Sequence, residues 1–376
     1  MSFGYIEFIP KTIGYWASRI HISRVPKPLT LTYSVTNLCN SRCKTCNLWK
    51  HYQNNPEKLK DEFKLEEIEK SFKSIGHTYF FNISGGEPFL RKDLPEIVEL
   101  ACKHLTPRII HTPTNAITPS LIEKQTEKIM QIINKYNPKI QFTIKPSFDA
   151  IGEKHDEIRG VKGNFENVVD TVARLKKLKE KYSNLHIGLG TVISKWSYPH
   201  LKETADYVKK LDVDSYIHEI AEQRSELFTE KSDIAPSIEE YEKAVEFFKD
   251  VVNKDLKEKN KLTRNTQAMR LLYYDLAVQT IKEKRQVIPC YAGWTNAHIS
   301  PYGDIWPCCV LGYSKSMGNL RDFNYDFKRL WNSKQANEVR KYIQNKKCSC
   351  PMANVTYSNI LVNPRMMLKV FRNMLK

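Results

Sequence analysis

Short strand-like segments alternate with amphipathic helical patterns from residue 31 onward, and this alternation restricts the fold more than any other feature. Between the segments, apolar residues recur at helical spacing, as Leu65, Ile68, Phe72 and Ile75 do. Six strand–helix units in succession predict a parallel sheet, because each helix returns the chain to the starting edge of the sheet. We therefore expect an α/β fold with a partial (β/α)6 barrel. Its strands are expected at 31–36, 79–84, 108–113, 141–147, 185–193 and 214–220.

The pattern changes after about residue 225, which indicates further parts outside the barrel. Residues 238–252 and 266–284 have helical apolar stripes, and the chain from Val287 is rich in Cys and aromatic residues. A segment of this kind is expected to be organised by metal rather than by a large apolar core. The expected parts are an amphipathic N-terminal segment (1–30), the barrel core (31–225), a helical bridge (226–286), a small Cys-rich C-terminal domain (287–360) and a basic amphipathic tail (361–376).

The chain is strongly basic, since 59 Lys and Arg against 42 Asp and Glu give a net charge of +17. This charge favours an anionic partner such as a nucleic acid, a lipid headgroup surface or a phosphorylated substrate. The basic residues are scattered over the predicted helices, however, and no RNA-binding module is recognisable. No apolar run is long enough to span a membrane, and the N-terminus lacks the features of a secretory signal. We therefore expect a cytoplasmic protein.

Nine cysteines are the residues best suited to chemistry, and their distribution predicts two metal sites. Without a secretory signal they are better interpreted as thiols or metal ligands than as disulfides. Cys39, Cys43 and Cys46 lie on the loop after the first predicted strand. Three thiolates on one loop can hold three irons of a [4Fe–4S] cluster and leave the fourth iron open. Zinc is the alternative, although it prefers four closed ligands and no further Cys or His follows until His51.

The segment around these cysteines, YSVTNLCNSRCKTCNLWK at Tyr33–Lys50, resembles the cluster-binding loop of the radical S-adenosylmethionine (SAM) superfamily. Three further segments resemble the family's motifs in the family's order: SGGEP at 84–88, Thr114-Asn115, and SFD at 147–149 followed by HDEIRG at 155–160. The resemblance covers about residues 31–220. Two positions depart from the family. Ala116 replaces a glycine, and Thr45 replaces an aromatic residue near the adenine, so that Trp49 or another residue would have to supply this contact.

This resemblance implies a SAM site at the carboxyl ends of the strands. The residues themselves agree with it: Gly85 and Gly86 allow close backbone approach, Glu87 offers a carboxylate to an ammonium group, and Pro88 stiffens the turn. Asp149 could contact the ribose or simply cap a helix. The expected SAM-binding residues are Gly85, Gly86, Glu87, Pro88, Asn115, Ser147, Asp149 and Arg159.

The C-terminal cysteines carry a second resemblance. The segments CYAG at 290–293, Gly303-x4-Cys308, GNL at 318–320 and LWNS at 330–333 are similar to the SPASM extension, which binds auxiliary Fe–S clusters in many radical SAM enzymes. Only five cysteines occur here, fewer than the full extension contains, which implies a shortened version with one auxiliary [4Fe–4S] cluster. Its expected ligands are Cys290, Cys308, Cys348 and Cys350, with Cys309 as an alternative to Cys308. A structural zinc knuckle is the competing interpretation, and Cys102 is expected to be a core residue.

The resemblance implies reductive cleavage of SAM to a 5′-deoxyadenosyl radical that takes hydrogen from an unactivated carbon. The implied partner is a one-electron reductant of the ferredoxin or flavodoxin type. In the tail, Arg365, Lys369 and Arg372 share a helical face, which indicates attachment to the inner face of a membrane. Packing of both chain ends on the barrel is the alternative.

From the basic ends we predict a lipid-chain substrate, with C–C bond formation on isoprenoid lipids as the concrete form. The runner-up is radical modification of a ribosomal peptide or protein side chain. Many such maturases carry a leader-peptide recognition domain, for which the thirty residues before the barrel are too few. RNA modification is a third hypothesis. An apolar tunnel would favour the lipid substrate, and a polar groove would favour the peptide.

Overall fold

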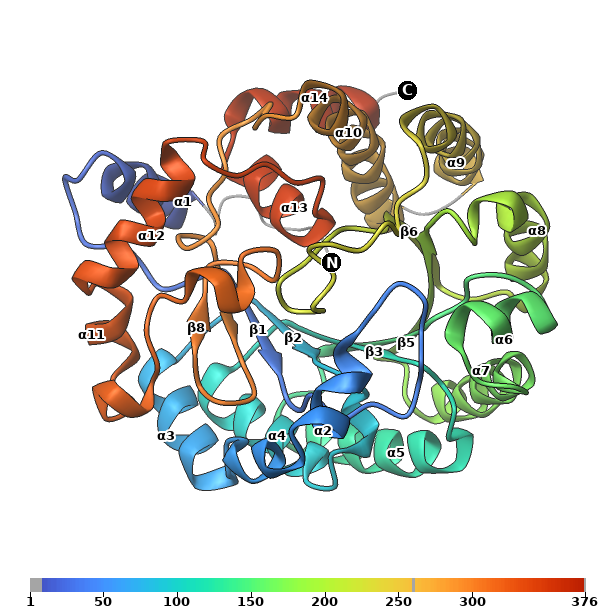
Figure 1. The fold of residues 1–376 in the computed structure, drawn as a ribbon, viewed down its shortest axis with the longest axis horizontal. Coiled ribbons are helices and arrows are strands. Elements are labelled where there is room, and N and C mark those ends of the chain that lie inside the picture. Colours follow the sequence, from blue (N-terminus) through green and yellow to red (C-terminus); the bar gives the residue numbers. More distant parts are fainter. Residues whose placement is uncertain (1–8, 259–260, 375–376) are drawn as a thin grey trace.

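A single sheet of eight strands organises the computed structural model, which describes residues 9–258 and 261–374 (Figure 1). Its order is β6-β5-β4-β3-β2-β1-β7-β8, and β1 to β6 are parallel. The predicted α/β fold with a partial barrel is confirmed, and every predicted strand boundary lies within two residues of the observed one. The six strands are β1 (Thr30–Ser34), β2 (Phe80–Ser84), β3 (Ile109–Thr114), β4 (Gln141–Pro146), β5 (Leu185–Ile193) and β6 (Ser215–Ile220).

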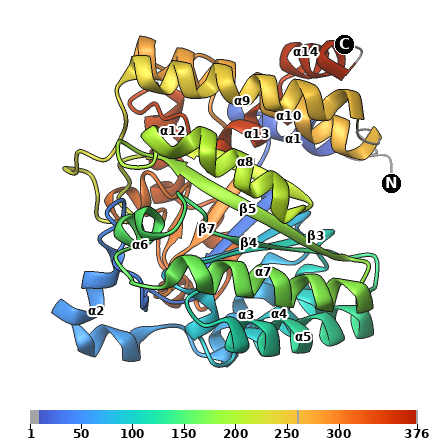
Figure 2. The same ribbon diagram turned by 90° about the vertical axis from the view of Figure 1, so that its right-hand side faces the viewer.

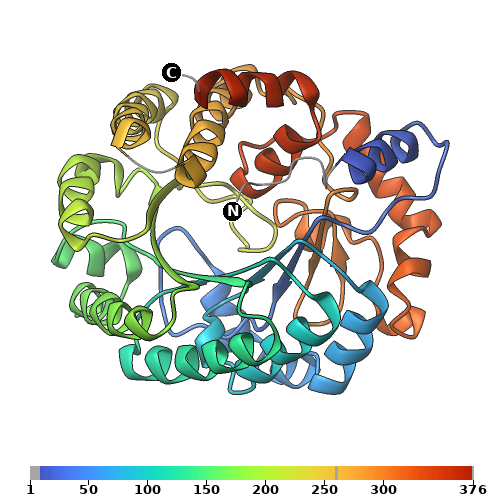
Figure 3. The same ribbon diagram turned by 180° about the vertical axis from the view of Figure 1, so that it is seen from behind.

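The crossover helices cover the outer face of the barrel (Figures 1 and 3). Strand side chains that face them, such as Leu31, Tyr33, Phe81 and Ile83, are fully buried and apolar. These side chains and the helix stripes form one large hydrophobic cluster. The crossover elements are α3 (Leu65–Ile75), α4 (Leu94–Leu100) with a π-helical turn (Ala101–Leu105), α5 (Pro119–Tyr136), α6 (Glu153–Arg159), α7 (Asn164–Lys181) and α8 (Leu201–Leu211).

The opposite side chains of the same strands line the barrel interior, and most of them are polar. They include Asn82, His111, Lys145 and Glu219, each of which remains partly accessible. The strict alternation of buried and partly accessible positions in β2, β3 and β4 shows that helices cover one face of each strand, whereas the other face borders the barrel interior, called the lumen below, and stays partly accessible.

The C-terminal region extends the barrel sheet. Strand β7 (Asn296–Ile299) pairs in parallel with β1, and β8 (Ile305–Trp306) pairs antiparallel with β7. The N–H groups of Leu29 and Thr30 both donate to the carbonyl of Thr295, at 2.9 and 3.0 Å. Apolar residues of this region, Trp331 among them, belong to the hydrophobic cluster of the barrel. The expectation that this region lacks a large apolar core is therefore wrong, because the region shares the core of the barrel.

Two long helices, α9 (Ile238–Glu258) and α10 (Lys261–Glu283), pack against each other beside β6 and α8 (Figure 1). They correspond to the expected helical bridge. The remaining helices are α2 (His51–Asn54), α11 (Phe327–Trp331), α12 (Lys334–Gln344), α13 (Ala353–Leu361) and α14 (Pro364–Met374). Short 3-10 turns lie at Leu48–Lys50, Pro56–Asp61, Pro88–Leu90, Tyr198–His200, Gly312–Lys315 and Arg321–Phe323.

Both terminal helices pack on the body of the protein. Helix α1 (Ile9–Arg19) is held where the indole N–H of Trp16 donates to the carbonyl of Val362 at 3.0 Å, and α14 buries Val370 against α10. Residues 1–8 of the predicted N-terminal segment lie outside the described residues. Figure 2 shows α1 and α14 on the side of the molecule away from α2. Among the described helices, none is both long and apolar enough to cross a membrane.

Candidate active site

The loop that carries Cys39, Cys43 and Cys46 leaves the carboxyl end of β1 and is clamped from two sides. On one side, the N–H of Arg42 and the hydroxyl of Ser41 both donate to the carbonyl of Arg159, at 3.0 and 2.9 Å. On the other side, the carboxylate of Glu62 accepts from the hydroxyl of Thr36 and the N–H of Asn37, at 2.7 and 2.9 Å. The fold thus fixes this loop before any ligand binds.

Two of the three thiols, those of Cys39 and Cys46, lie in surroundings that oppose a free thiolate. Burial raises the pKa of Cys39 to about 12 and also raises the pKa of Cys46. The buried guanidinium of Arg159 lies near Cys39 and Cys43 and places a positive charge beside the loop. A buried thiolate needs a compensating cation, and iron ligation supplies one.

The donor groups of the cysteine loop come from one segment of the chain. Among the described residues, no three His, Cys, Asp or Glu side chains converge closely enough to hold one metal ion. Zinc requires its ligands around one centre, whereas each thiolate of a [4Fe–4S] cluster binds a different iron. The donor set, three thiols on a fixed loop with a cation beside them, is compatible with the expected cluster.

The glycine-rich turn after β2 packs directly on the backbone of the cysteine loop. The N–H of Gly86 donates to the carbonyl of Thr36, and the N–H of Glu87 donates to that of Leu38, both at 2.8 Å. A Cβ atom on Gly85 or Gly86 would lie 2.2 Å from a carbonyl oxygen of the loop. These glycines are therefore required for the contact between the turn and the cysteine loop.

The carboxylate of Glu87 has partners within the protein, and its expected role toward an ammonium group stays a prediction. Its side chain is fully buried and accepts hydrogen bonds from the hydroxyl of Thr114 at 2.9 Å, from the N–H of Asn115 at 2.6 Å and from the N–H of Phe89 at 3.2 Å. These bonds tie the turn after β2 to the end of β3. Pro88, also buried, begins the short 3-10 turn that follows.

The other expected SAM-binding residues lie around the same loop. The amide of Asn115 donates to Asn40 at 2.8 Å and lies 3.8 Å from the sulfur of Cys39. The carboxylate of Asp149 pairs with Arg159 at 3.2 Å and accepts from a backbone N–H of β5, so it is held within the protein. Ser147, at the end of β4, is only half-buried.

The structure shows the surroundings of Ala116 and Thr45, the two residues that depart from the family pattern. Ala116 is buried in a left-handed backbone conformation with a φ of 58°, which glycine adopts at lower cost. Thr45 is half-buried, and the indole N–H of Trp49 donates to the carbonyl of Cys46 at 3.0 Å. An aromatic ring therefore lies beside the third cysteine, although it comes from a position later in the loop.

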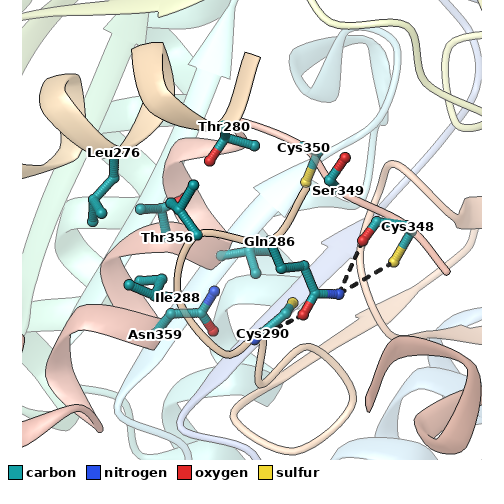
Figure 4. Close-up of a pocket in the computed structure, with 12 residues that line it drawn as sticks. Leu276, Thr280, Gln286, Ile288, Cys290, Cys348, Ser349, Cys350, Thr356 and Asn359 are labelled. Carbon is teal, nitrogen blue, oxygen red and sulfur yellow. Dashed lines mark hydrogen bonds between the residues drawn. The ribbon is translucent and has the colours of Figure 1, made fainter. Parts of the chain in front are cut away.

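A second group of cysteines gathers around a cavity of about 40 Å³ (Figure 4). Cys290, Cys348 and Cys350 line this cavity. Cys308 lies within electrostatic range of all three. The structure thus brings together the four thiols expected to bind the auxiliary cluster, which come from three separate parts of the sequence.

Cys309 faces a different environment from its neighbour Cys308. Its thiol lies near Arg224 and near Glu226, Glu219 and Glu222, at the barrel lumen. Cys308, by contrast, lies near Cys290, Cys348 and Cys350, so its surroundings favour it over Cys309 as the fourth ligand, and the assignment stays a prediction.

Gln286 was missed in the sequence, although it lies at the centre of the cysteine group. Its amide donates to the carbonyl of Cys348 at 2.9 Å and lies 4.0 Å from that residue's sulfur, while its oxygen accepts from the N–H of Cys290 at 3.4 Å (Figure 4). It thereby fixes the spacing of two expected ligands. A lone Gln four residues before a cysteine carries no motif signal.

The lumen beside the cysteine loop contains several charged side chains. Lys145 on β4 pairs with Glu219 on β6 at 3.6 Å, and the glycines of β5 at 188 and 190 leave room for its side chain. Burial alone would lower the pKa of the Arg224 guanidinium, but the neighbouring thiol of Cys309 and three nearby carboxylates raise it. A ligand in this lumen would meet charged and polar groups.

Comparisons with known proteins agree with this geometry. Residues 33–208 match the Radical SAM superfamily, and residues 290–351 match SPASM, an iron–sulfur cluster-binding domain. The chain is 23% identical over 314 residues to AlbA, the antilisterial bacteriocin subtilosin biosynthesis protein of Bacillus subtilis, covering 82% of this chain but only 60% of AlbA. It is 24% identical over 323 residues to an AdoMet-dependent heme synthase of Methanosarcina barkeri, covering 82% of this chain and 84% of that protein.

Among solved structures, SuiB of Streptococcus suis bound to its precursor peptide SuiA superposes with a TM-score of 0.59 at 16% identity, covering 89% of this chain and 71% of SuiB. At this identity the likeness shows a common fold.

Proposed function

Because the chain is a radical SAM enzyme with a SPASM iron–sulfur domain, we propose that it modifies a ribosomally made peptide or a protein side chain at an unactivated carbon. The observation that carries this proposal is the polar, charged lumen beside the cysteine loop, where Lys145, Glu219 and Arg224 lie. A peptide presents amides and charged side chains that such a lumen can pair with. The peptide-related names of AlbA and SuiB support the same class.

The cysteines and their neighbours have distinct tasks in this proposal. Cys39, Cys43 and Cys46 would hold the SAM-binding [4Fe–4S] cluster, and Cys290, Cys308, Cys348 and Cys350 the auxiliary one. When bound and reduced by a ferredoxin- or flavodoxin-type partner, the first cluster with SAM supplies an oxidant strong enough to take hydrogen from an aliphatic carbon.

The protein residues position the reactants and limit side reactions. Arg159 stabilises the thiolate form of the cysteine loop, and Glu87 fixes the turn against which SAM would lie. Lys145 and Glu219 would orient charged groups of the substrate in the lumen.

The lipid substrate that we predicted from the sequence has little support. An apolar tunnel was expected for it, whereas the interior-facing side chains, Asn82, His111 and Lys145 among them, are polar. In addition, the basic amphipathic helices α1 and α14 lie on the side of the molecule away from α2 and the cysteine loop (Figure 2). A hydrocarbon chain that entered at these helices would not meet the mouth of the barrel.

A second candidate is a tetrapyrrole. The match to the heme synthase of M. barkeri covers 84% of that protein, whereas the match to AlbA covers 60% of AlbA. Lys145 and Arg224 would then pair with the carboxylates of the macrocycle.

The test is an isotope-transfer experiment on anaerobically reconstituted protein with SAM and dithionite. Deuterated peptides, deuterated iron-coproporphyrin and vesicles of deuterated isoprenoid lipid are supplied in separate reactions. Deuterium in the 5′-deoxyadenosine product, measured by mass spectrometry, identifies the compound that loses hydrogen. We expect transfer from peptide in the wild type and none in the Cys39→Ala/Cys43→Ala/Cys46→Ala variant. Transfer from the porphyrin alone would favour the second candidate, and transfer from lipid alone would overturn the proposal.

A further inference from the structure

Exposed apolar side chains are concentrated on the two terminal helices. Ten large hydrophobic residues are exposed in the described part of the chain, and six of them lie on α1, in the turn that follows it, or on α14. Ile9, Ile13 and Ile20 are each more than half exposed; the first two lie one turn apart on α1, and Ile20 follows its last residue. On α14, Leu368 and Phe371 are 53% and 57% exposed and lie one turn apart. Single exposed apolar residues need no explanation, but a set confined to one part of the surface does.

These helices are held firmly by their inner faces, so their outer faces form a fixed surface. Besides the bond of Trp16 to Val362, the amide of Gln344 in α12 donates to the carbonyl of Arg19 at the end of α1, at 3.3 Å. In α14, Val370 is buried in a cluster with Ala268 and Leu272 of α10. Figures 2 and 3 both place α1 and α14 on the same side of the molecule. We call their outer faces the terminal-helix surface, defined by Ile9, Ile13, Ile20, Leu368 and Phe371.

The two terminal helices, α1 and α14, carry positively charged side chains only. Helix α1 contains Lys11 and Arg19, helix α14 contains Arg365, Lys369 and Arg372, and neither helix contains Asp or Glu. On α14, Arg365, Lys369 and Arg372 are exposed beside Leu368 and Phe371. Cations that alternate with exposed apolar side chains are the pattern of helices that lie in the headgroup region of an anionic bilayer.

We propose that the terminal-helix surface binds an anionic membrane peripherally. Leu368, Phe371 and the isoleucines of α1 enter the boundary between headgroups and acyl chains, while Lys369 and Arg372 pair with lipid phosphates. Because α2 and the cysteine loop lie on the opposite side, the mouth of the barrel faces away from the bilayer and stays open to a water-borne substrate (Figure 2). This inference does not depend on the substrate proposed above.

The test is co-sedimentation of the full-length, cluster-loaded protein with vesicles. One set of vesicles is phosphatidylcholine alone, and the other contains about one third phosphatidylglycerol. We expect binding to the second set only. The double substitutions Leu368→Ser/Phe371→Ser and Lys369→Gln/Arg372→Gln are each expected to weaken this binding about tenfold or more, since each buried side chain or paired cation contributes roughly fivefold.

Matched variants elsewhere separate a specific surface from general attraction of a basic protein. Leu59→Ser/Tyr136→Ser removes apolar side chains of similar exposure, and Lys124→Gln/Lys128→Gln removes two exposed cations from α5. Both controls are expected to bind as the wild type does, and iron content and circular dichroism should be unchanged in all four variants. Absence of binding to the anionic vesicles, or equal loss in controls and test variants, would overturn the proposal. Self-association that Leu368→Ser/Phe371→Ser abolishes would overturn it too, because it would assign the surface to a second copy of the chain.

Discussion

Replacing Glu67 by glutamine removes the negative charge and one acceptor oxygen from the main polar link between the first crossover helix, α3, and the C-terminal region. The carboxylate of Glu67 accepts two hydrogen bonds from the guanidinium of Arg321, at 2.7 and 3.0 Å, and a third from the hydroxyl of Tyr325 at 2.9 Å. It also accepts from the N–H of Lys64 at 3.0 Å, at the start of its own helix. One carboxylate thus joins the barrel to a segment more than 250 residues later in the chain.

The pKa of this carboxyl gives the scale of the effect. Partial burial would raise the pKa of Glu67, but the hydrogen bonds from Arg321, Lys64 and Tyr325 outweigh burial and lower it from 4.5 to about 2. At 1.36 kcal/mol per pH unit this corresponds to an upper bound of about 3 kcal/mol. Since the side chain of Arg321 is 37% exposed, screening by water reduces the expected contribution to about 1–2 kcal/mol.

The assay is urea unfolding under anaerobic conditions at pH 7.5. Glu67→Gln is expected to lower the unfolding midpoint at an unchanged m-value. The matched control is Glu66→Gln, which changes the exposed neighbouring carboxylate on the same helix. It is expected to change stability by less than about 0.5 kcal/mol.

The pH dependence supplies an independent check of the sign. A carboxyl whose pKa is lower in the folded state stabilises the protein above its unfolded pKa, and this stabilisation is lost as pH falls toward the folded value. In metal-free protein, the difference between wild type and Glu67→Gln should stay constant from pH 8 to about 5 and shrink between about 4.5 and 2. A difference that equals that of Glu66→Gln, or that grows in acid, would refute the reasoning.

Three further predictions concern the cysteine sites. Cys308→Ser should remove about half of the bound iron and the auxiliary electron paramagnetic resonance signal, whereas Cys309→Ser should retain both; the reverse result would assign the ligand to Cys309. Gln286→Leu should lower the midpoint potential of the auxiliary cluster in film voltammetry, because amide hydrogen bonds near a ligand sulfur favour the reduced state, and an unchanged potential would exclude this role. Gly86→Ala should lower the free energy of unfolding by more than about 2 kcal/mol and lose iron from the first site, because the added Cβ would lie 2.2 Å from the carbonyl oxygen of Leu38. A variant with wild-type iron content and melting temperature would contradict this prediction.

The barrel strands could be predicted from the sequence because two periodicities agree in each unit. Strand residues such as Leu31 and Tyr33 alternate with polar neighbours, and the helix residues Ile68 and Phe72 recur at helical spacing. The addition of β7 to the sheet could not be predicted in this way. Strand β7 has only four residues, and it does not form a strand–helix–strand unit with β1. Its partner lies more than 250 residues earlier in the chain.

For the site residues as well, only part of the arrangement could be predicted from the sequence. Motif spacing indicated which residues meet around the cysteine loop, but not which of their polar atoms already have partners. Glu87 is the clearest case, because its bonds to Thr114 and Asn115 depend on the register of two strands. The different surroundings of Cys308 and Cys309 likewise follow from the backbone path after β8, which no local pattern encodes.

The pairing of β7 with β1 has a consequence for how the chain can be divided experimentally. A fragment that stops before residue 287 would retain the whole radical SAM motif set, yet it would leave one edge of β1 without its partner and would expose apolar surface that Trp294 and Trp331 normally cover. An unprotected parallel strand of this kind invites intermolecular pairing. The catalytic barrel is therefore not a portable module in this protein, and fusions or domain exchanges are better joined outside the eight-stranded sheet than at the boundary that sequence motifs suggest.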